Sequence, residues 1–435
     1  MGFVRTYCVI AVFFVASSRL NAQFGHILDA VGPVNQSMGG AGVALPLDAM
    51  GALHWNPASI SWLEKSEIGF GLAGFAAEIE LASGVDANAF GPGVPNTNLR
   101  GRTKADSEIN PIPSMGIVCH EPNSNLSYGL GGYAIGGFGV SYPLDPNNPI
   151  LTPQPPDGGI GFGAIYSQFQ LLQFSPTVAI KVSDTWSVGF APTFNWASWA
   201  LDPFAAAAPN ANGAYPWATH ADVAWGLGFQ VGAMYRNVCS GLSLGFSYKS
   251  PQWFQDFKFN SQDDLGNPRT LTFNLDYPSI VTFGLGWQGH SRVSAALDVR
   301  YVDYSNTDGF GAWGFNNSNA VDGFGWNSIW VVSSGIQYLM TDRLALRFGY
   351  TYNESPISSR SAFFNTPAPG IIQHHLSTGF SYDTNRGWDS TMTFHYRFEN
   401  TTSGSWYSTL GPVPGTSVRS YLTTYTVSAG FRKRF

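Results

Sequence analysis

Few side chains in this sequence could do chemistry, and none of them form a recognisable catalytic or metal-binding motif. No Cys or His cluster has the spacing of zinc ligands. His374 and His375 are adjacent, so on a strand they would face opposite sides and could not hold one metal ion. We therefore expect no enzyme, no metal and no cofactor. The remaining candidates are polar residues at alternate positions within apolar segments: Asp298, Arg300, Arg347, His395, Arg397 and Arg432.

The segments that carry these residues alternate with period two, as strands do. In Arg343–Tyr352 (RLALRFGYTY), every second residue from Leu344 onward is large and apolar, while Arg343 and Arg347 lie on the other face. Similar alternation occurs in Val223–Tyr235, Arg292–Tyr301 and Trp388–Phe398. Apolar residues toward lipid, polar residues toward a lumen and aromatic residues at the strand ends are typical of a transmembrane antiparallel β-barrel.

Composition and the N-terminus favour the same class of protein. Only 11% of residues are charged and the net charge is −6, whereas a soluble domain carries roughly 25% charged residues. Arg5 and the short apolar run Tyr7–Ala16 indicate a secretory signal peptide over residues 1–22, cleaved after Ala22 or after Ser18. No later apolar run is long enough for a membrane helix, which leaves a soluble β-rich protein or a membrane β-barrel. The scattered Lys and Arg give no basic face for nucleic acid.

Connections between the strands alternate between short turns and long loops, as the periplasmic turns and outer loops of bacterial barrels do. The long connections are predicted at 83–113, 143–163, 202–222, 305–325, 354–373 and 401–419. Counting through this alternation predicts about fourteen strands within residues 64–435. Cys119 and Cys239 should lie near short turns several strands apart, which favours two isolated thiols over the alternative, a disulfide formed in an oxidising compartment. The amphipathic last segment ends at Phe435, which resembles the signal that outer-membrane barrels present to the barrel-assembly machinery.

An N-terminal block without alternation, residues 23–63, carries a family resemblance. It contains SMGGAGVALPLDAMGALHWNPAS: a Gly/Ala-rich run, an Asp-Ala pair and an Asn-Pro-Ala turn before the first strand. This block resembles the N-terminal plug of the FadL/TodX family of outer-membrane transporters for long-chain fatty acids and other hydrophobic compounds, and LRFGYTYNESPI (346–357) resembles a late strand of that family. The resemblance implies a plug inside the barrel, where Gly and Ala allow close backbone approach. Its characteristic residues would be Gly39, Gly40, Gly42, Asp48, Asn56, Pro57 and Ala58.

Two further segments are candidate ligand sites. In the third strand, the outward phase shifts at Gly131-Gly132 and again at Gly136-Gly137, which predicts a bulge or kink. The family resemblance implies a side exit into the membrane at such a kink. The outer loop 202–222 is apolar, and we expect its exposed aromatic residues to capture ligand; these are Phe204, Tyr215 and Trp217.

The lumen-facing arginines allow two interpretations. Arg300, Arg347 or Arg397 could bind a carboxylate head group, because the guanidinium fork matches a carboxylate. The alternative, which we favour for most of them, is a ladder of ion pairs that packs the barrel wall against the plug.

The resemblance implies passive uptake of a hydrophobic small molecule, such as a fatty acid, an alkane or an aromatic compound. We expect a monomer in the outer membrane of a Gram-negative bacterium, in contact with membrane lipid and lipopolysaccharide. A general porin would have a ring of charges and no plug, so residues 23–63 argue against it. A FadL-like barrel that serves as a docking or assembly factor for protein secretion stays open, and it would have a filled lumen without a continuous apolar pocket.

Overall fold

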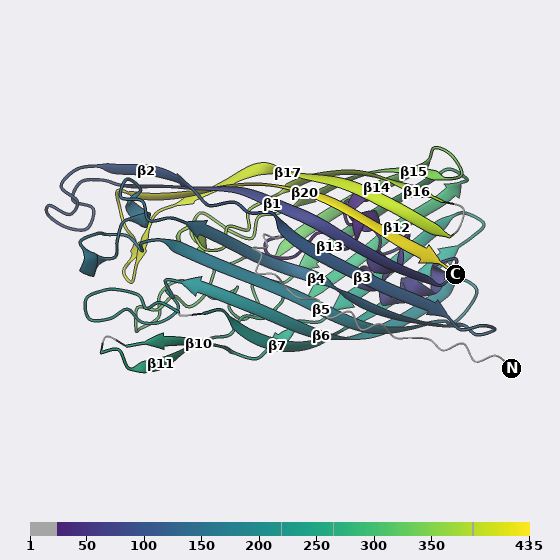
Figure 1. The fold of residues 1–435 in the computed structure, drawn as a ribbon, viewed down its shortest axis with the longest axis horizontal. Helices are drawn as coiled ribbons and strands as arrows, with labels where there is room; N and C mark the ends of the chain where they lie inside the picture. Colours follow the sequence, from purple (N-terminus) through teal and green to yellow (C-terminus); the bar gives the residue numbers. More distant parts are fainter. Residues whose placement is uncertain (1–23, 219, 264, 385–386) are drawn as a thin grey trace.

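Fourteen long antiparallel strands close into a barrel, as predicted (Figure 1). The computed structural model describes residues 24–218, 220–263, 265–384 and 387–435; the predicted signal peptide, with Ala22 and Ser18, lies outside them. Closure is made by β1, which pairs with β20 along one edge and with β3 along the other. The wall strands are β1 (Glu67–Val85), β3 (Asn110–His120), β4 (Leu126–Tyr142), β5 (Ile165–Lys181), β6 (Trp186–Asp202), β7 (Asp222–Asn237), β8 (Leu242–Lys249), β12 (Ile280–His290), β13 (Val293–Val302), β14 (Ile329–Leu339), β15 (Leu344–Asn353), β16 (His374–Asp383), β17 (Trp388–Gly404) and β20 (Thr416–Arg434).

Shorter strands extend the wall into the outer loops. β2 (Leu99–Lys104) pairs with the upper part of β1, above the part that pairs with β3. The segment 83–113, predicted to be one long loop, is therefore partly strand. Residues 83–85 belong to β1, and residues 99–104 form β2, which pairs with the same edge of β1 as β3 does. The outer loops also hold β9 (Trp253–Phe254), which pairs with β7, and the hairpins β10 (Phe257–Gln262) with β11 (Pro268–Phe273) and β18 (Tyr407–Ser408) with β19 (Gly411–Pro412).

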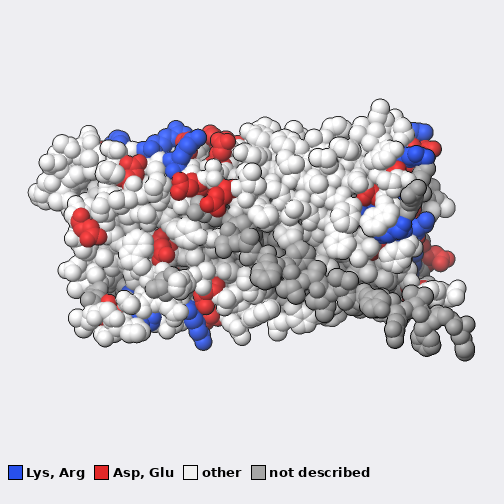
Figure 2. Space-filling model, in the orientation of Figure 1, with Lys and Arg blue, Asp and Glu red and all other residues white. Residues whose placement is uncertain are grey.

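An uncharged belt surrounds the barrel between two charged ends, as Figure 2 shows on one face. Large apolar side chains from the outward phase of the strands fill this belt, and many are more than 40% exposed: Leu72, Phe190, Leu227, Phe283, Phe348, Phe394 and Val427. Exposed apolar area on this scale requires an apolar solvent. The belt is therefore the lipid-facing surface, and the inward phase faces the lumen.

The N-terminal segment lies inside the barrel and forms three short helices (purple in Figure 1). These are α1 (Pro33–Ser37), α2 (Ala49–Trp55) and η1 (Pro57–Trp62), and all of their residues are buried. The Asp48 carboxylate caps α2 by accepting from Gly51 N at 3.2 Å, and the Asn56 amide oxygen caps η1 by accepting from Ala58 N at 3.0 Å. Pro57 occupies the first turn of η1, where its missing N–H costs nothing.

Three further short helices belong to the outer loops: η2 (Pro149–Leu151), η3 (Pro155–Asp157) and η4 (Phe363–Asn365). No helix among the described residues is long and apolar enough to span a membrane.

Candidate functional site

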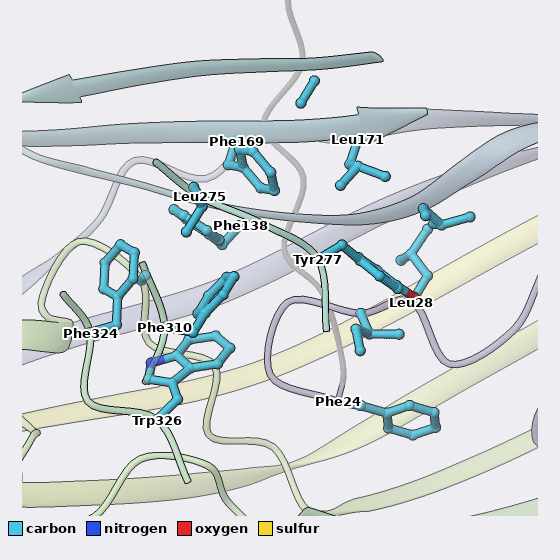
Figure 3. Close-up of a cluster of buried hydrophobic side chains, with 14 of the residues drawn as sticks. Phe24, Leu28, Phe138, Phe169, Leu171, Leu275, Tyr277, Phe310, Phe324 and Trp326 are labelled. Atoms are coloured by element: carbon cyan, nitrogen blue, oxygen red, sulfur yellow. The ribbon is translucent and has the colours of Figure 1, made fainter. Parts of the chain in front are cut away.

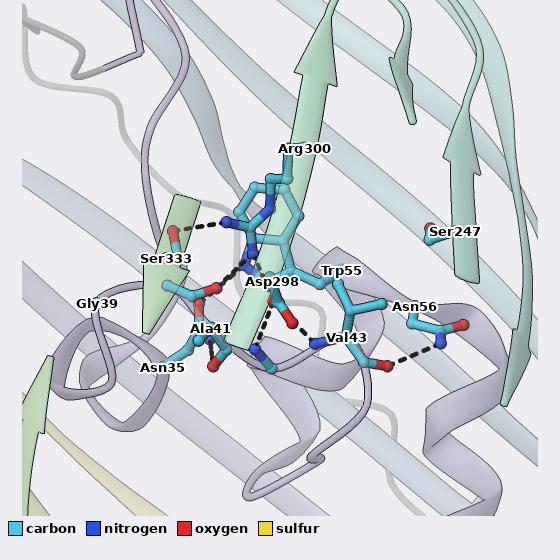
Figure 4. Close-up of polar contacts among 12 residues, drawn as sticks. Asn35, Gly39, Ala41, Val43, Trp55, Asn56, Ser247, Asp298, Arg300 and Ser333 are labelled. Atoms are coloured by element: carbon cyan, nitrogen blue, oxygen red, sulfur yellow. Dashed lines mark hydrogen bonds and ion pairs between the residues drawn. The ribbon is translucent and has the colours of Figure 1, made fainter. Parts of the chain in front are cut away.

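The plug is tied to the wall by polar contacts centred on Asp298 and Arg300 of β13 (Figure 4). Asp298 Oδ2 accepts from the backbone N–H of Gly42 at 2.8 Å and of Val43 at 3.2 Å. Arg300 Nη2 donates to Asp298 Oδ2 at 2.8 Å and to the Gly40 carbonyl at 2.7 Å. Both side chains are fully buried. They contact the plug through hydrogen bonds to its backbone.

A second buried cluster joins Asp29 of the plug to Arg397 of β17. Arg397 Nη2 lies 3.0 Å from Asp29 Oδ1, and Oδ2 of the same carboxylate lies 3.0 Å from His375 Nδ1 and 3.3 Å from His395 Nε2. Burial alone would raise the pKa of Asp29, but Arg397, His395 and His375 together hold it well below its usual value. Asp29 is therefore an ionised anchor for the plug.

The donor set of this cluster does not fit a metal ion, although its ligand atoms lie within 4.8 Å of one another. Arg397 Nη2 lies 3.2 Å from His395 Nδ1, and a guanidinium can only donate. The neutral ring of His395 therefore carries its proton on Nε2, the atom that faces Asp29. A protonated nitrogen offers no lone pair to a cation. The cluster therefore anchors the plug by ion pairing and N–H contacts to Asp29, without a metal ion.

The other lumen-facing arginines lie at the periplasmic side of the plug. Arg432 Nε pairs with Asp389 at 2.6 Å, and its Nη1 donates to the Leu47 carbonyl at 2.5 Å. Arg347 bonds Gln337 and Ser381 and lines a polar cavity of about 500 Å³. Of the three arginines proposed to bind a carboxylate, two are therefore used by plug contacts, and the third faces this polar cavity.

Lys249 is a buried cation that the sequence analysis did not identify. Lys249, at the end of β8, is 2% exposed, and its Nζ donates to Gln173 Oε1 at 3.2 Å. No carboxylate lies within 4.0 Å of Lys249 in the described part of the chain. Its position could have been found from the inward phase of β8, which also contains Ser243 and Ser247.

Glycines on the inward phase of the wall make room for the plug. A Cβ at Gly232 of β7 would lie 2.0 Å from Asn56 Oδ1, and one at Gly189 of β6 would lie 2.4 Å from Ala58 N. Within the plug, Gly40 has a φ of +76°, and its Cβ would lie 2.0 Å from the Asp29 carbonyl oxygen. Asn56 and Ala58 thus lie where the plug approaches the wall closely, and Gly40 lies where two parts of the plug approach each other. The sequence signal for Gly232 was the alternation of glycine with apolar residues in Val223–Tyr235.

Above the plug, the lumen is apolar and aromatic (Figure 3). Phe138 and Phe169, on β4 and β5, stack with ring centroids 5.1 Å apart, and Phe310 lies 5.6 Å from Phe324. Phe324 also lines a small outer pocket of about 70 Å³, together with Trp199, Phe273 and Phe363 and with Pro203, Ala205 and Ala206 of the loop 202–222. A row of rings therefore leads inward from the outer pocket toward the plug.

The loop 202–222 lines this pocket, but its aromatic side chains are not all exposed as predicted. Phe204 is fully buried and packs on Phe259 at 4.8 Å, so its prediction as an exposed capture residue is wrong. The β10–β11 hairpin, which the sequence analysis did not identify, provides Phe259 and covers Phe204. Tyr215 is partly buried and its hydroxyl donates to the Asn319 carbonyl at 3.1 Å, whereas Trp217 is 50% exposed.

The third wall strand, β4, has one break. Its pairing with β3 ends at Ser114 and Tyr133, and its pairing with β5 has a one-residue bulge at Ile135, between Ala134 and Gly136. Beyond this point the plug supplies the missing partner, because Leu28 N donates to the Ile135 carbonyl at 2.9 Å and Gly137 N to the His26 carbonyl at 2.8 Å. The N-terminal end of the plug thus occupies the edge that β3 leaves.

The prediction of two phase shifts in β4 is wrong, because the pairing contains a single one. Gly131 and Gly132 pair regularly with Ser175 and Phe174 of β5. The bulge alone exchanges the inward and outward phases, and Gly136 and Gly137 follow it directly. Glycine at 131 and 132 weakens side-chain packing without changing the register.

Cys119 and Cys239 are both free thiols, as predicted. Cys119 lies near the end of β3 and is partly buried, while Cys239 is exposed in the turn between β7 and β8.

Comparisons with known proteins agree with this architecture. A family model described as outer membrane protein transport protein (OMPP1/FadL/TodX) matches residues 25–435. No curated protein matches the chain. A Pseudomonas aeruginosa FadL homologue has 16% identity and a TM-score of 0.70, over 94% of this chain and 100% of that chain. The Pseudomonas putida toluene transporter TodX has 16% identity and a TM-score of 0.66, over 95% and 100% of the two chains. The Ralstonia pickettii toluene transporter TbuX has 16% identity and a TM-score of 0.62, over 94% and 99%. Because these proteins are only 16% identical to this chain, the structural matches establish the fold alone.

Proposed function

The chain belongs to the FadL/TodX family of bacterial outer-membrane transport proteins, and on that premise we propose that it takes up hydrophobic small molecules by passive diffusion. Fatty acids, alkanes and aromatic compounds all suit an apolar lining, and the names of two related structures describe toluene transporters. The outer pocket would receive the ligand, and the row of rings above the plug would pass it inward. Exit would be sideways, into the membrane, at the break in β4.

The observation that carries this proposal is the position of the break relative to the rings. Phe138 follows the bulge by three residues on β4, and its ring stacks on Phe169. The edge freed by β3 is closed by backbone bonds from residues 26–28, which belong to the plug and not to the wall. The segment is also held by the Tyr304 hydroxyl, which contacts Phe24 and His26, by the Asp29–Arg397 pair, and by the packing of buried Leu28. None of these contacts belongs to the pairing of the wall strands, so the segment could leave without opening that pairing.

A second function, docking or assembly in protein secretion, has an observation in its favour. The plug fills the lumen and is held by the buried Asp29–Arg397 ion pair and by hydrogen bonds to Asp298 and Arg300, and the outer pocket measures only about 70 Å³. Pockets for small molecules usually reach several hundred Å³. Transport of a tracer by the wild-type protein decides between the two functions.

A reversible tether tests the side exit. Ile27 and Gly136 form an antiparallel bridge of the type without mutual hydrogen bonds, for which Cα atoms lie roughly 4.5 Å apart. This separation suits a disulfide. We would combine Ile27→Cys with Gly136→Cys in a background with Cys119→Ser and Cys239→Ser, and measure uptake of radiolabelled toluene and oleate by cells. Uptake should be lost on oxidation and restored by a reductant.

The two single-Cys variants, treated with the same oxidant, control for chemical damage. Equal uptake by the oxidised and reduced double variant would contradict the side exit. Absence of uptake by the wild-type protein would contradict transport as a whole and favour the docking function.

A further inference from the structure

Basic side chains gather on the outer face of the wall where β1, β2 and β20 leave the uncharged belt, at the end of the barrel with the long loops (Figure 2). The strand register places the outward-facing residues Arg102, Ala82 and Arg419 in one row across these three strands. Arg100 lies one outward position farther from the belt on β2. Neighbouring strands are roughly 4.8 Å apart, so the small side chain of Ala82 leaves a gap of about 10 Å between the Cα atoms of Arg102 and Arg419.

This row lies just beyond the lipid-facing surface. Along β20, the outward phase runs from Val427, which is 51% exposed, through Tyr425 and Tyr421 to Arg419. Along β1, the same phase begins with apolar residues such as Leu72, which is 57% exposed. Aromatic residues of a barrel mark the membrane interface, and its long loops face outward. The row is therefore level with the head groups of the outer leaflet.

A cavity of about 640 Å³ opens at this row. Among the described residues that line it, the charged ones are all arginines: Arg100 of β2, Arg360 of the loop 354–373 and Arg419 of β20. Serine hydroxyls also line it, among them those of Ser403 and Ser417. The cavity thus has cationic and neutral hydrogen-bond donors, and its lining contains no carboxylate in the described part of the chain.

The carboxylates nearest the cavity are already paired with other cations. Glu80 of β1 pairs with Arg102 and with Lys104, whose Nζ lies 3.6 Å from the Glu80 carboxylate. Asp86 pairs with Arg100. These pairs neutralise the charge on β2 and leave the charge in the cavity to the other two arginines.

Arg360 and Arg419 have no ion-pair partner among the residues that the structure describes. The Arg360 guanidinium lies over the Trp313 ring, 4.0 Å from its centroid, so its position is set by stacking rather than by a carboxylate. Arg419 is exposed at the edge of the cavity. Glu78, also exposed on the outward face of β1, lies nearer the belt by two outward positions than Ala82. Two arginines of one cavity therefore lack a counter-ion.

We propose that this cavity binds a phosphate group of lipopolysaccharide in the outer leaflet. The inference goes beyond the proposed uptake function and does not depend on it. Arg360 and Arg419 would donate to the phosphate oxygens, because the guanidinium fork matches the geometry of a phosphate. The hydroxyls of Ser403 and Ser417 would donate to the remaining oxygens. The acyl chains of the same molecule would lie along the apolar belt.

The position of the cavity favours a lipid over a soluble anion. A free phosphate at exposed arginines gains little, because water and salt screen the charges. A phosphate that belongs to a lipid is held at this level by its acyl chains. Since Arg360 lies in the loop that also carries Phe363 of the outer pocket, a phosphate shared with Arg419 would tie that loop to the wall.

Lipid A with and without its phosphates tests the proposal. Full-length protein refolded in detergent, and therefore free of cellular lipopolysaccharide, would be titrated with bisphosphorylated lipid A or dephosphorylated lipid A, and bound lipid would be counted by native mass spectrometry. We expect the wild-type protein to bind the bisphosphorylated form at least about tenfold more tightly, the size of one charge-assisted hydrogen bond. Arg360→Gln and Arg419→Gln should each weaken that binding about fivefold and leave binding of the dephosphorylated form unchanged.

Arg343→Gln is the matched control, because Arg343 is an exposed arginine at the periplasmic cavity and has no ion pair among the described residues. It should bind both lipids as the wild type does, and heat-modified gel mobility should show all three variants folded. Equal binding of the two lipids by the wild-type protein, or an equal loss in Arg343→Gln, would overturn the proposal. Inorganic phosphate is the third probe: displacement of lipid A by phosphate at equal concentration would assign the cavity to a free anion and also overturn it.

Discussion

Asp29 and Arg397 lie 368 residues apart in the sequence, yet Nη2 of the guanidinium lies 3.0 Å from Oδ1 of the carboxylate in the closed barrel. Asp29 belongs to the plug and Arg397 to β17, so this buried ion pair joins the inside of the barrel to its wall.

Replacing Asp29 with Asn should loosen the plug. Arg397 would then be a buried charge without a counter-ion, which costs about 3–5 kcal/mol when one partner of a buried pair is removed. We expect a lower midpoint in heat-modified gel mobility and larger ion conductance in planar bilayers. Asp342→Asn is the matched control, since Asp342 is 99% exposed and 3.8 Å from Arg292. Equal behaviour of the two variants would show that the pair does not anchor the plug.

Gly232→Ala should displace the turn at Asn56. The added Cβ would lie 2.0 Å from Asn56 Oδ1, so the cap of η1 must move, at an expected cost of about 1–3 kcal/mol. Gly132→Ala is the comparison, because its Cβ would lie 3.3 Å from the flexible ring of Phe174. Unfolding midpoints in urea should fall for the first variant only. A similar loss in both would point to a general intolerance of alanine in these strands.

We expect the stability of the protein to depend on pH through Asp48. Burial, and then the nearby Glu67, raise the pKa of Asp48 to about 7, above its value of roughly 3.9 in an unfolded chain. The folded state therefore holds a proton that the unfolded state releases, and stability falls as pH rises from about 4 to 7. Asp48→Asn keeps a capping side chain and should flatten this slope. The test is the thermal midpoint between pH 4 and 8, and parallel slopes for the two proteins would refute the assignment.

Deleting residues 23–59 should leave a barrel that inserts into the membrane, because the wall strands begin at Glu67. The lumen would then be open from the outer pocket to the periplasmic cavity. We expect heat-modifiable protein whose conductance in planar bilayers rises well above that of the wild type. Unchanged conductance would mean that this segment does not block the lumen.

The sequence by itself determined the architecture. Period-two alternation in segments such as Arg343–Tyr352 reflects lipid on one side of a strand and a lumen on the other, and that constraint acts on each strand separately. The strand count, the plug block around Asn56-Pro57-Ala58 and the family could therefore be predicted. Local chemistry also determined the caps at Asp48 and Asn56, because a cap requires only residues a few positions away.

The tertiary structure decided which polar groups meet and where the wall breaks. Arg300 and Arg397 face the lumen by phase, but the closed barrel selects their plug partners, the Gly40 carbonyl for Arg300 and Asp29 for Arg397. The pattern within β4 predicted a shift at Gly136-Gly137, next to the bulge at Ile135, but the register against β5 decided that this shift occurs and the one at Gly131-Gly132 does not. Phe204 is buried because the β10–β11 hairpin covers it, and His26 meets Tyr277 because the plug and an outer loop converge. These contacts join segments far apart in the chain, and their energies depend on positions that only the closed barrel defines.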